Sequence, residues 1–208
     1  MPTLKEVLEI FYLLSGPALV FIAYRALEQI KVSKEISRTN AKRESLILTA
    51  KECRNYAQNV IPFCNSFNEK VEKYDAKFFT KSKVTVSDDR IEVSYYKGND
   101  DQALFPEELG EDIMNLINAL SSFSNFFISG VADERIAYKS LGNTYCGIVK
   151  KLVPILVRIA EEHNEDNILK LFMIWHNRKE IENAQKEKEA LERKINKQKE
   201  ISISVIGA

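Results

Sequence analysis

The sequence predicts a mainly α-helical protein: an amino-terminal transmembrane helix, a long juxtamembrane helix, and a cytoplasmic helical bundle with one small β-hairpin and a charged carboxyl-terminal helix. Three observations predict this. An uncharged apolar run lies near the start, apolar residues then recur every three or four positions, and one short segment alternates with a period of two. We divide the chain into an anchor (1–27), a spacer (28–45), a helical domain (46–177) with its hairpin at 83–96, and a charged helix and tail (178–208).

Composition narrows the class of protein. The 208 residues hold 30 basic and 30 acidic side chains, so no net charge favours bulk binding of DNA or RNA. A hydrophobic content of 45%, with 7 Gly and 5 Pro, is typical of a folded chain. Three cysteines do not make a disulfide framework, and no Cys or His spacing matches a zinc site.

The apolar run extends from Ile10 to Tyr24 without a charged residue and predicts a single membrane span. Extended from Val7 to Ala26, it covers about 30 Å as a helix, which is one hydrocarbon thickness. A buried helix and a signal peptide are the alternatives. Bulky residues close the run and disfavour cleavage, and the run lacks the polar face of a core helix.

Cations on the carboxyl side of this run set the expected topology. Because lysine and arginine near a span are retained in the cytoplasm, we expect the amino terminus outside and the remaining chain in the cytoplasm. The residues assigned to membrane topology are Arg25, Lys31, Lys34, Arg38, Lys42 and Arg43. The Gly16–Pro17 pair predicts a kink in the span, with self-association of spans as an alternative reading.

Helical periodicity organises the chain from Leu46 onward. No proline or glycine lies between Arg25 and Val60, so the juxtamembrane helix is expected to continue until Pro62 bends or ends it near Val60. Its predicted apolar face consists of Leu46, Ala50, Cys53, Ala57, Val60, Cys64, Phe67 and Val71. On such a face the cysteines are expected to pack as small hydrophobic side chains.

A period of two predicts the β-hairpin at 83–96. Apolar residues alternate on both sides of residues 87–90, whose polar side chains are typical of a turn. An isolated hairpin is marginally stable in water. We therefore expect it to lie against the bundle, or alternatively to form a contact in an oligomer.

Three helices are expected after the hairpin. The first opens at Pro106 with a break at Gly110, the second is capped by Asp133, and the third starts near Asn167. From residue 178 this last helix is almost purely charged, which indicates a solvated helix or, alternatively, a coiled-coil seam. The final residues alternate apolar and polar, which favours a strand or a frayed end.

The sequence holds no motif of a known reaction. It contains neither a P-loop nor a dinucleotide-binding fingerprint, and His163 and His176 belong to no metalloprotease motif. We therefore expect a non-enzymatic protein with no catalytic residue, cofactor or metal. A soluble helical enzyme remains the second alternative.

Aromatic and basic residues form a candidate binding set. Aromatic faces and donors after the hairpin could stack a base or contact a phosphate, and cations along one helix could form an anion pocket, especially around an oligomer axis. The candidate ligand-binding residues are Tyr95, Tyr96, Lys97, Asn99, Arg135, Lys139, Lys150, Lys151 and Arg158. Scattered, solvated charges are the alternative reading of the cations.

Three segments carry a resemblance to known proteins: Tyr24–Gln29 after the run, Leu116–Leu120, and Gly130–Glu134 ahead of Tyr145. In these segments the chain resembles small bacterial single-span membrane-anchored helical proteins of unknown function, often phage- or defence-associated. The resemblance implies a single-pass protein of the bacterial inner membrane with its carboxyl-terminal domain in the cytoplasm. It implies no defined reaction.

The leading functional prediction is a homo-oligomeric, single-pass membrane protein whose cytoplasmic helical domain binds a protein or a small signal. The alternative is an oligomeric membrane effector of antiviral defence. In that alternative a nucleotide second messenger binds the cytoplasmic domain and rearranges the spans, so that the protein acts on the lipid bilayer.

Overall fold

The computed structural model describes residues 3–87, 90–96, 107–162 and 167–199. They fall into two units, Met1–Ile47 and Leu48–Ala208. Among the described residues, the first unit is a stretch of one helix from Leu4 onward, and the second is mainly helical with a two-stranded sheet. The prediction of a mainly α-helical chain with one hairpin is confirmed.

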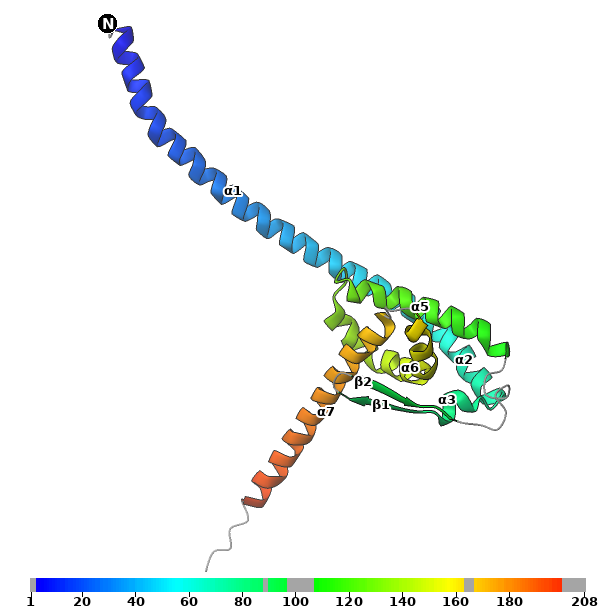
Figure 1. Cartoon of the computed structure of the whole chain (residues 1–208). Coiled ribbons are helices and arrows are strands. Elements are labelled where there is room, and N and C mark those ends of the chain that lie inside the picture. The colour runs from blue at the N-terminus through cyan, green and yellow to red at the C-terminus, as the bar shows by residue number, and fades with distance from the viewer. Residues whose placement is uncertain (1–2, 88–89, 97–106, 163–166, 200–208) are drawn as a thin grey trace, which may run out of the picture. The chain divides into compact units, whose positions relative to one another are not determined.

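Helix α1 (Leu4–Asn55) makes up the first unit and continues into the second (blue to cyan in Figure 1). Pro17 lies inside it, and its described side chains from Leu8 to Glu44 are exposed. Within the part of the chain that the structure describes, no helix combines the length and apolarity needed to cross a bilayer. The side chains of Ile10, Phe11 and Leu14 in the predicted run lie outside that part.

The predicted interruption near Val60 is a π-helical turn. This turn, η1 (Tyr56–Val60), lies between α1 and α2 (Ile61–Lys73), and Pro62 occupies the first turn of α2. Proline has no N–H to donate, and its ring crowds the carbonyl four residues earlier. A wider turn accommodates both effects without ending the helical path.

The π-helical turn also shows where the predicted apolar face was wrong. From Val60 onward the predicted residues are buried, but Ala50 and Ala57 are exposed. Buried in their place, on the amino-terminal side of the turn, are Thr49, Glu52 and Tyr56. The face crosses the turn at intervals of four, through Glu52, Tyr56, Val60 and Cys64, because a π turn holds more residues than an α turn.

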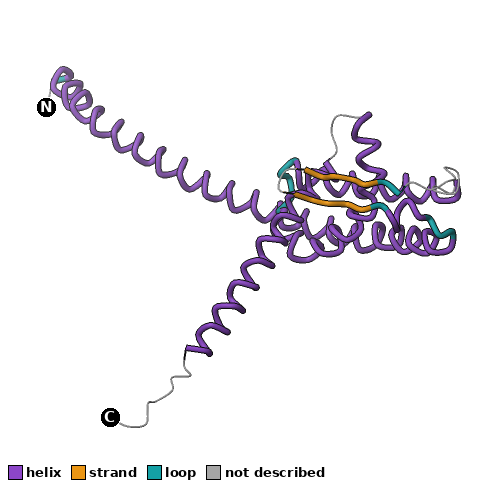
Figure 2. Tube along the Cα trace, turned by 60° about the horizontal axis from the view of Figure 1, so that its bottom comes forward, coloured by secondary structure: helices purple, strands orange, loops and turns teal. Residues whose placement is uncertain are grey.

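The hairpin lies where the period of two predicts it. Strands β1 (Lys83–Ser87) and β2 (Arg90–Ser94) are antiparallel, with Val84 opposite Val93 and Val86 opposite Ile91 (orange in Figure 2). These four side chains pack on the core. A short helix that the sequence did not predict, α3 (Lys77–Lys81), precedes the hairpin and buries Phe78 and Phe79. The central turn residues Asp88 and Asp89 lie outside the described residues.

Three long helices complete the second unit: α5 (Gly110–Ile128), α6 (Glu134–Glu162) and α7 (Asn167–Lys199). A 3-10 turn, η2 (Glu107–Leu109), precedes α5, so the helix type changes at the predicted break. The Asp133 carboxylate accepts the Ile136 N–H at 3.2 Å, which confirms the predicted cap of α6. In α7, residues 183–197 are all exposed.

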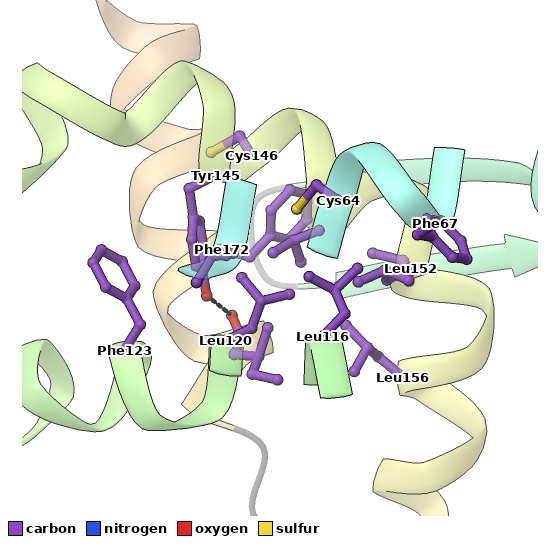
Figure 3. Close-up of a cluster of buried hydrophobic side chains, with 14 of the residues drawn as sticks. Cys64, Phe67, Leu116, Leu120, Phe123, Tyr145, Cys146, Leu152, Leu156 and Phe172 are labelled. Atoms are coloured by element: carbon purple, nitrogen blue, oxygen red, sulfur yellow. Dashed lines mark hydrogen bonds between the residues drawn. The ribbon is translucent and has the colours of Figure 1, made fainter. Parts of the chain in front are cut away.

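Aromatic rings and one hydroxyl pair form the centre of the bundle. Tyr145 on α6 and Trp175 on α7 are fully buried, with ring centroids 4.9 Å apart. The Tyr145 hydroxyl lies 2.8 Å from Ser124 Oγ and donates to the Ile168 carbonyl (dashed line to Tyr145 in Figure 3). Apolar side chains from α2, α5 and α6 surround this pair.

The cysteines pack as hydrophobic side chains, as predicted. Cys64 and Cys146 are buried and unpaired with each other, and Cys53 is half-buried. Burial raises the pKa of the Cys64 thiol to about 12 and that of Cys146 to about 11. Both therefore stay protonated near neutral pH.

Candidate functional site

Two of the sequence-predicted binding residues meet at the end of the hairpin. Tyr95 stacks on Phe78, with centroids 6.0 Å apart and planes inclined by 20°. The Arg158 guanidinium of α6 lies 5.4 Å from the Tyr95 ring and 5.8 Å from the Phe78 ring. Because these faces already contact Arg158, the cluster joins the hairpin to α6 rather than offering free rings to a base.

The other predicted residues lie apart from this cluster. The Tyr96 N–H donates to Ser82 Oγ, and Lys151 donates to Asn68 Oδ1 of α2 at 2.8 Å. Arg135 and Lys150 are exposed on α6, while Lys97 and Asn99 lie outside the described residues. Lys139 and Arg158 are separated by about 28 Å along α6 at the usual helical rise. Within one copy, the predicted cations that the structure describes therefore do not gather at one site.

Lys139 instead borders a polar groove between α6 and α7. The groove has a volume of about 240 Å³. It is lined by Tyr138, Lys139, Asn143, Lys179, Glu182, Asn183 and Lys186. We call this the α6–α7 groove. Side chains three and four residues apart share a helix face, so two short runs on facing helices supply the whole lining.

The Tyr138 ring lines the α6–α7 groove, and an ion pair between the two helices lies beside that ring. The Glu134 carboxylate accepts hydrogen bonds from both terminal nitrogens of the Arg178 guanidinium, at 2.7 and 2.9 Å. It also accepts a hydrogen bond from the Trp175 indole N–H. The Arg178 guanidinium lies 4.8 Å from the centre of the Tyr138 ring. Tyr138 is therefore held between charged groups of α7 and the backbone of its own helix.

Gly142 allows the Tyr138 ring to lie against the next turn of α6. A Cβ atom at residue 142 would stand 2.5 Å from the Tyr138 ring, which is too close for any real contact. With that space available, the Tyr138 hydroxyl reaches Glu182 and donates to it at 3.0 Å. Burial and the Glu182 carboxylate raise the pKa of Tyr138 to about 12, so it remains a donor.

The electrostatics of the α6–α7 groove follow from this contact. Glu182 accepts a hydrogen bond from Tyr138, and among the described residues it forms no ion pair with Lys186, four residues further along α7. Among the described residues, none of the three groove lysines has an ion-pair partner. Three ammonium groups facing one carboxylate suit an anionic ligand.

No family model, characterised protein or solved structure matches the chain. The chemistry of the groove must therefore indicate the ligand. Within the described ranges, no group of three or more His, Cys, Asp or Glu side chains is placed to hold a metal ion.

Sequence reasoning identified only Lys139 in this groove. It missed Lys179 and Lys186 because they belong to a long charged stretch, where each cation resembles its exposed neighbours. The available signal was the position of Lys179 four residues after Trp175, with Lys186 seven residues further on, and the spacing of Lys139 and Asn143 on α6.

Proposed function

We propose that this chain is a non-catalytic binding module, tethered to a bilayer by its amino-terminal helix, whose α6–α7 groove receives an anionic group of a protein or a small signal. The observation that carries the proposal is the meeting of Lys139, Lys179 and Lys186 around one cavity. The single carboxylate among the lining residues already accepts a hydrogen bond from Tyr138.

The amino-terminal helix supports the tethering part of the proposal. Large apolar side chains that are more than half exposed cover the described portion of the run: Tyr12, Leu13, Leu19, Val20, Phe21, Ile22 and Tyr24. Such a surface needs an apolar partner, and a helix that is apolar on all sides is typical of a bilayer or a protein interior. The cations that follow, beginning with Arg25, favour a bilayer as this partner, with these cations on its cytoplasmic side.

The groove is tested on the full chain in detergent micelles by isothermal titration calorimetry. Three probes cover the anionic classes: a hexaglutamate peptide, inorganic pyrophosphate and a cyclic dinucleotide. We expect one of them to bind the native chain with an affinity that falls as salt rises. The variant with Lys179→Gln and Lys186→Gln should weaken that binding about tenfold or more, because each charged hydrogen bond contributes about 1.5–3 kcal/mol.

Lys188→Gln together with Lys194→Gln is the matched control, since these lysines lie on the exposed end of the same helix. Equal affinities of the two double variants would refute the groove as the binding site. Tethering is tested separately, by washing vesicles that carry the full chain with alkaline carbonate. Recovery of the chain in the supernatant would refute a bilayer span.

The alternative effector function makes a different prediction for the same probes. If the cyclic dinucleotide binds in the groove and also releases dye from vesicles that carry the full chain, the protein acts on the bilayer. Binding without dye release favours the tethered module.

A further inference from the structure

A second site lies at the π-helical turn, on residues that the α6–α7 groove does not use. Glu52 on α1 is 6% exposed, and Tyr56 in η1 has no exposed surface. The Tyr56 hydroxyl has no hydrogen-bond partner. Among the described residues, no hydrogen bond or ion pair engages the Glu52 carboxylate. The Glu52 carboxylate therefore belongs to a largely buried side chain without a partner in the described part of the chain, and its oxygens stay accessible to a ligand.

Glu52 and Tyr56 are among the residues around one cavity. It has a volume of about 110 Å³ and lies between the π-helical turn and α5. The residues that matter for its chemistry are Glu52, Asn55, Tyr56, Asn59, Ser122 and Phe123. Asn55, Asn59 and Ser122 are exposed, so the cavity opens to solvent through a neutral polar rim. We call this the π-turn cavity.

The floor of the π-turn cavity combines one negative charge with aromatic surface. The Tyr56 ring and the Phe123 ring of α5 (Phe123 is labelled in Figure 3) have centroids 4.7 Å apart. A carboxylate beside aromatic rings is the environment that binds organic cations, through a charged hydrogen bond and attraction to the ring faces. The rim amides of Asn55 and Asn59 add oxygen acceptors for further N–H donors.

Other ligand classes fit this cavity less well. An anion would be repelled by Glu52, which is the single carboxylate among the lining residues. A divalent metal ion collects several charged or carbonyl oxygens, and one carboxylate falls short of such a set. The volume equals that of about three or four water molecules, which suits an ammonium or guanidinium head group and excludes a large ring system.

We propose that the π-turn cavity binds a primary ammonium or guanidinium group, with Glu52 as its charge partner and the side-chain amides of Asn55 and Asn59 as additional acceptors. The group arrives either on a diffusible amine or on a lysine or arginine side chain of another protein. The inference is independent of the proposed function, because the two sites share no lining residue.

The test compares probes that differ only in charge. The full chain in detergent is mixed with butylammonium chloride or with butanol, and its thermal unfolding midpoint is followed by circular dichroism. We expect the midpoint to rise with butylammonium and to stay unchanged with butanol. Acetyl-Ala-Arg-Ala-amide and acetyl-Ala-Gln-Ala-amide repeat the comparison for a protein-borne cation. A response to either cation supports the site, and which one responds identifies its source.

Glu52→Gln separates a binding role from a structural one. Because no hydrogen bond or ion pair within the described residues is lost by the substitution, the free variant should unfold at a temperature equal to or above that of the native chain. Its affinity for the cationic probe should fall about tenfold, since a charged hydrogen bond is lost. Glu72→Gln, on the exposed face of α2, should leave both quantities unchanged. Equal responses to the charged and neutral probes, or an undiminished response in Glu52→Gln, would overturn the proposal.

Discussion

Replacing Glu134 should show how strongly the contact between α6 and α7 depends on one carboxylate. Glu134 and Arg178 are joined by two hydrogen bonds, and their side chains are 22% and 30% exposed. Exposed ion pairs contribute about 0–1 kcal/mol, and breaking a buried pair costs about 3–5 kcal/mol. For this half-buried pair we expect a coupling free energy of about 1.5 kcal/mol.

A double-mutant cycle isolates that coupling. Glu134 is the first residue of α6, so Glu134→Gln also loses a favourable interaction with the helix dipole of about 0.5 kcal/mol. It weakens the bond to the Trp175 indole as well. Measuring Glu134→Gln, Arg178→Gln and the double variant subtracts both effects. The assay is urea unfolding of the full chain followed by circular dichroism, because the indole is too close to the substitutions to be a neutral probe.

The pair Glu189–Arg193 provides a control on the exposed end of α7. Its atoms lie 3.8 Å apart, and its side chains are 67% and 81% exposed. The same cycle there should give a coupling below about 0.5 kcal/mol. If the two cycles give equal couplings, the reasoning from burial and bond geometry is wrong.

Three further outcomes are expected. Leu120→Ala, at a fully buried position, should lower the free energy of unfolding by about 2–5 kcal/mol in urea, whereas exposed Leu191→Ala should change it by less than about 0.5 kcal/mol. Burial lowers the pKa of His176 below the ordinary histidine value of about 6.5, so the unfolded chain binds the proton more tightly. Stability should therefore be complete above about pH 6.5 and fall as the pH drops toward the folded-state pKa, and His176→Gln should flatten that fall. Ellman's reagent at pH 8 should modify half-buried Cys53 before Cys64 and Cys146, and reaction of all three thiols at one rate in the folded chain would contradict their burial.

Local chemistry made much of the fold predictable. The hairpin followed from alternation about a polar turn, and Asp133 was recognisable as a cap because its carboxylate can reach an N–H three residues on. Pro62 correctly marked an interruption of the helix. Pro62 did not reveal the type of interruption. A bend, the end of a helix and a π turn can each accommodate a proline that has no N–H to donate.

That ambiguity concealed the π-turn cavity. An uninterrupted α-helical face would place Ala57 in the core. With the wider π turn, Glu52 and Tyr56 are buried instead. A glutamate on the amino-terminal side of a proline-induced turn looks like an ordinary surface charge in the sequence. Its burial depends on how α5 packs across the turn, which is tertiary information.

The α6–α7 groove was hidden for a different reason. Its lysines come from segments about 40 residues apart in the chain, and their meeting depends on the packing of Trp175 against Tyr138 and Tyr145. The sequence of α6 alone shows several cations, and Lys139 was predicted as a binding residue for that reason. Only the pairing of helices selects which cations share a cavity.

The hydroxyl pair between Ser124 and Tyr145 determines how the bundle can be assembled. If one helix slid by a single turn, or about 5.4 Å, the Tyr145 hydroxyl would be stranded in a hydrocarbon environment, and Ser124 would keep only its bond to the Leu120 carbonyl of its own helix. The aliphatic side chains around them would tolerate such a slip, because leucine and valine fill space without directional bonds. Two oxygen atoms among these apolar groups thus select one alignment of α5, α6 and α7 over its near neighbours.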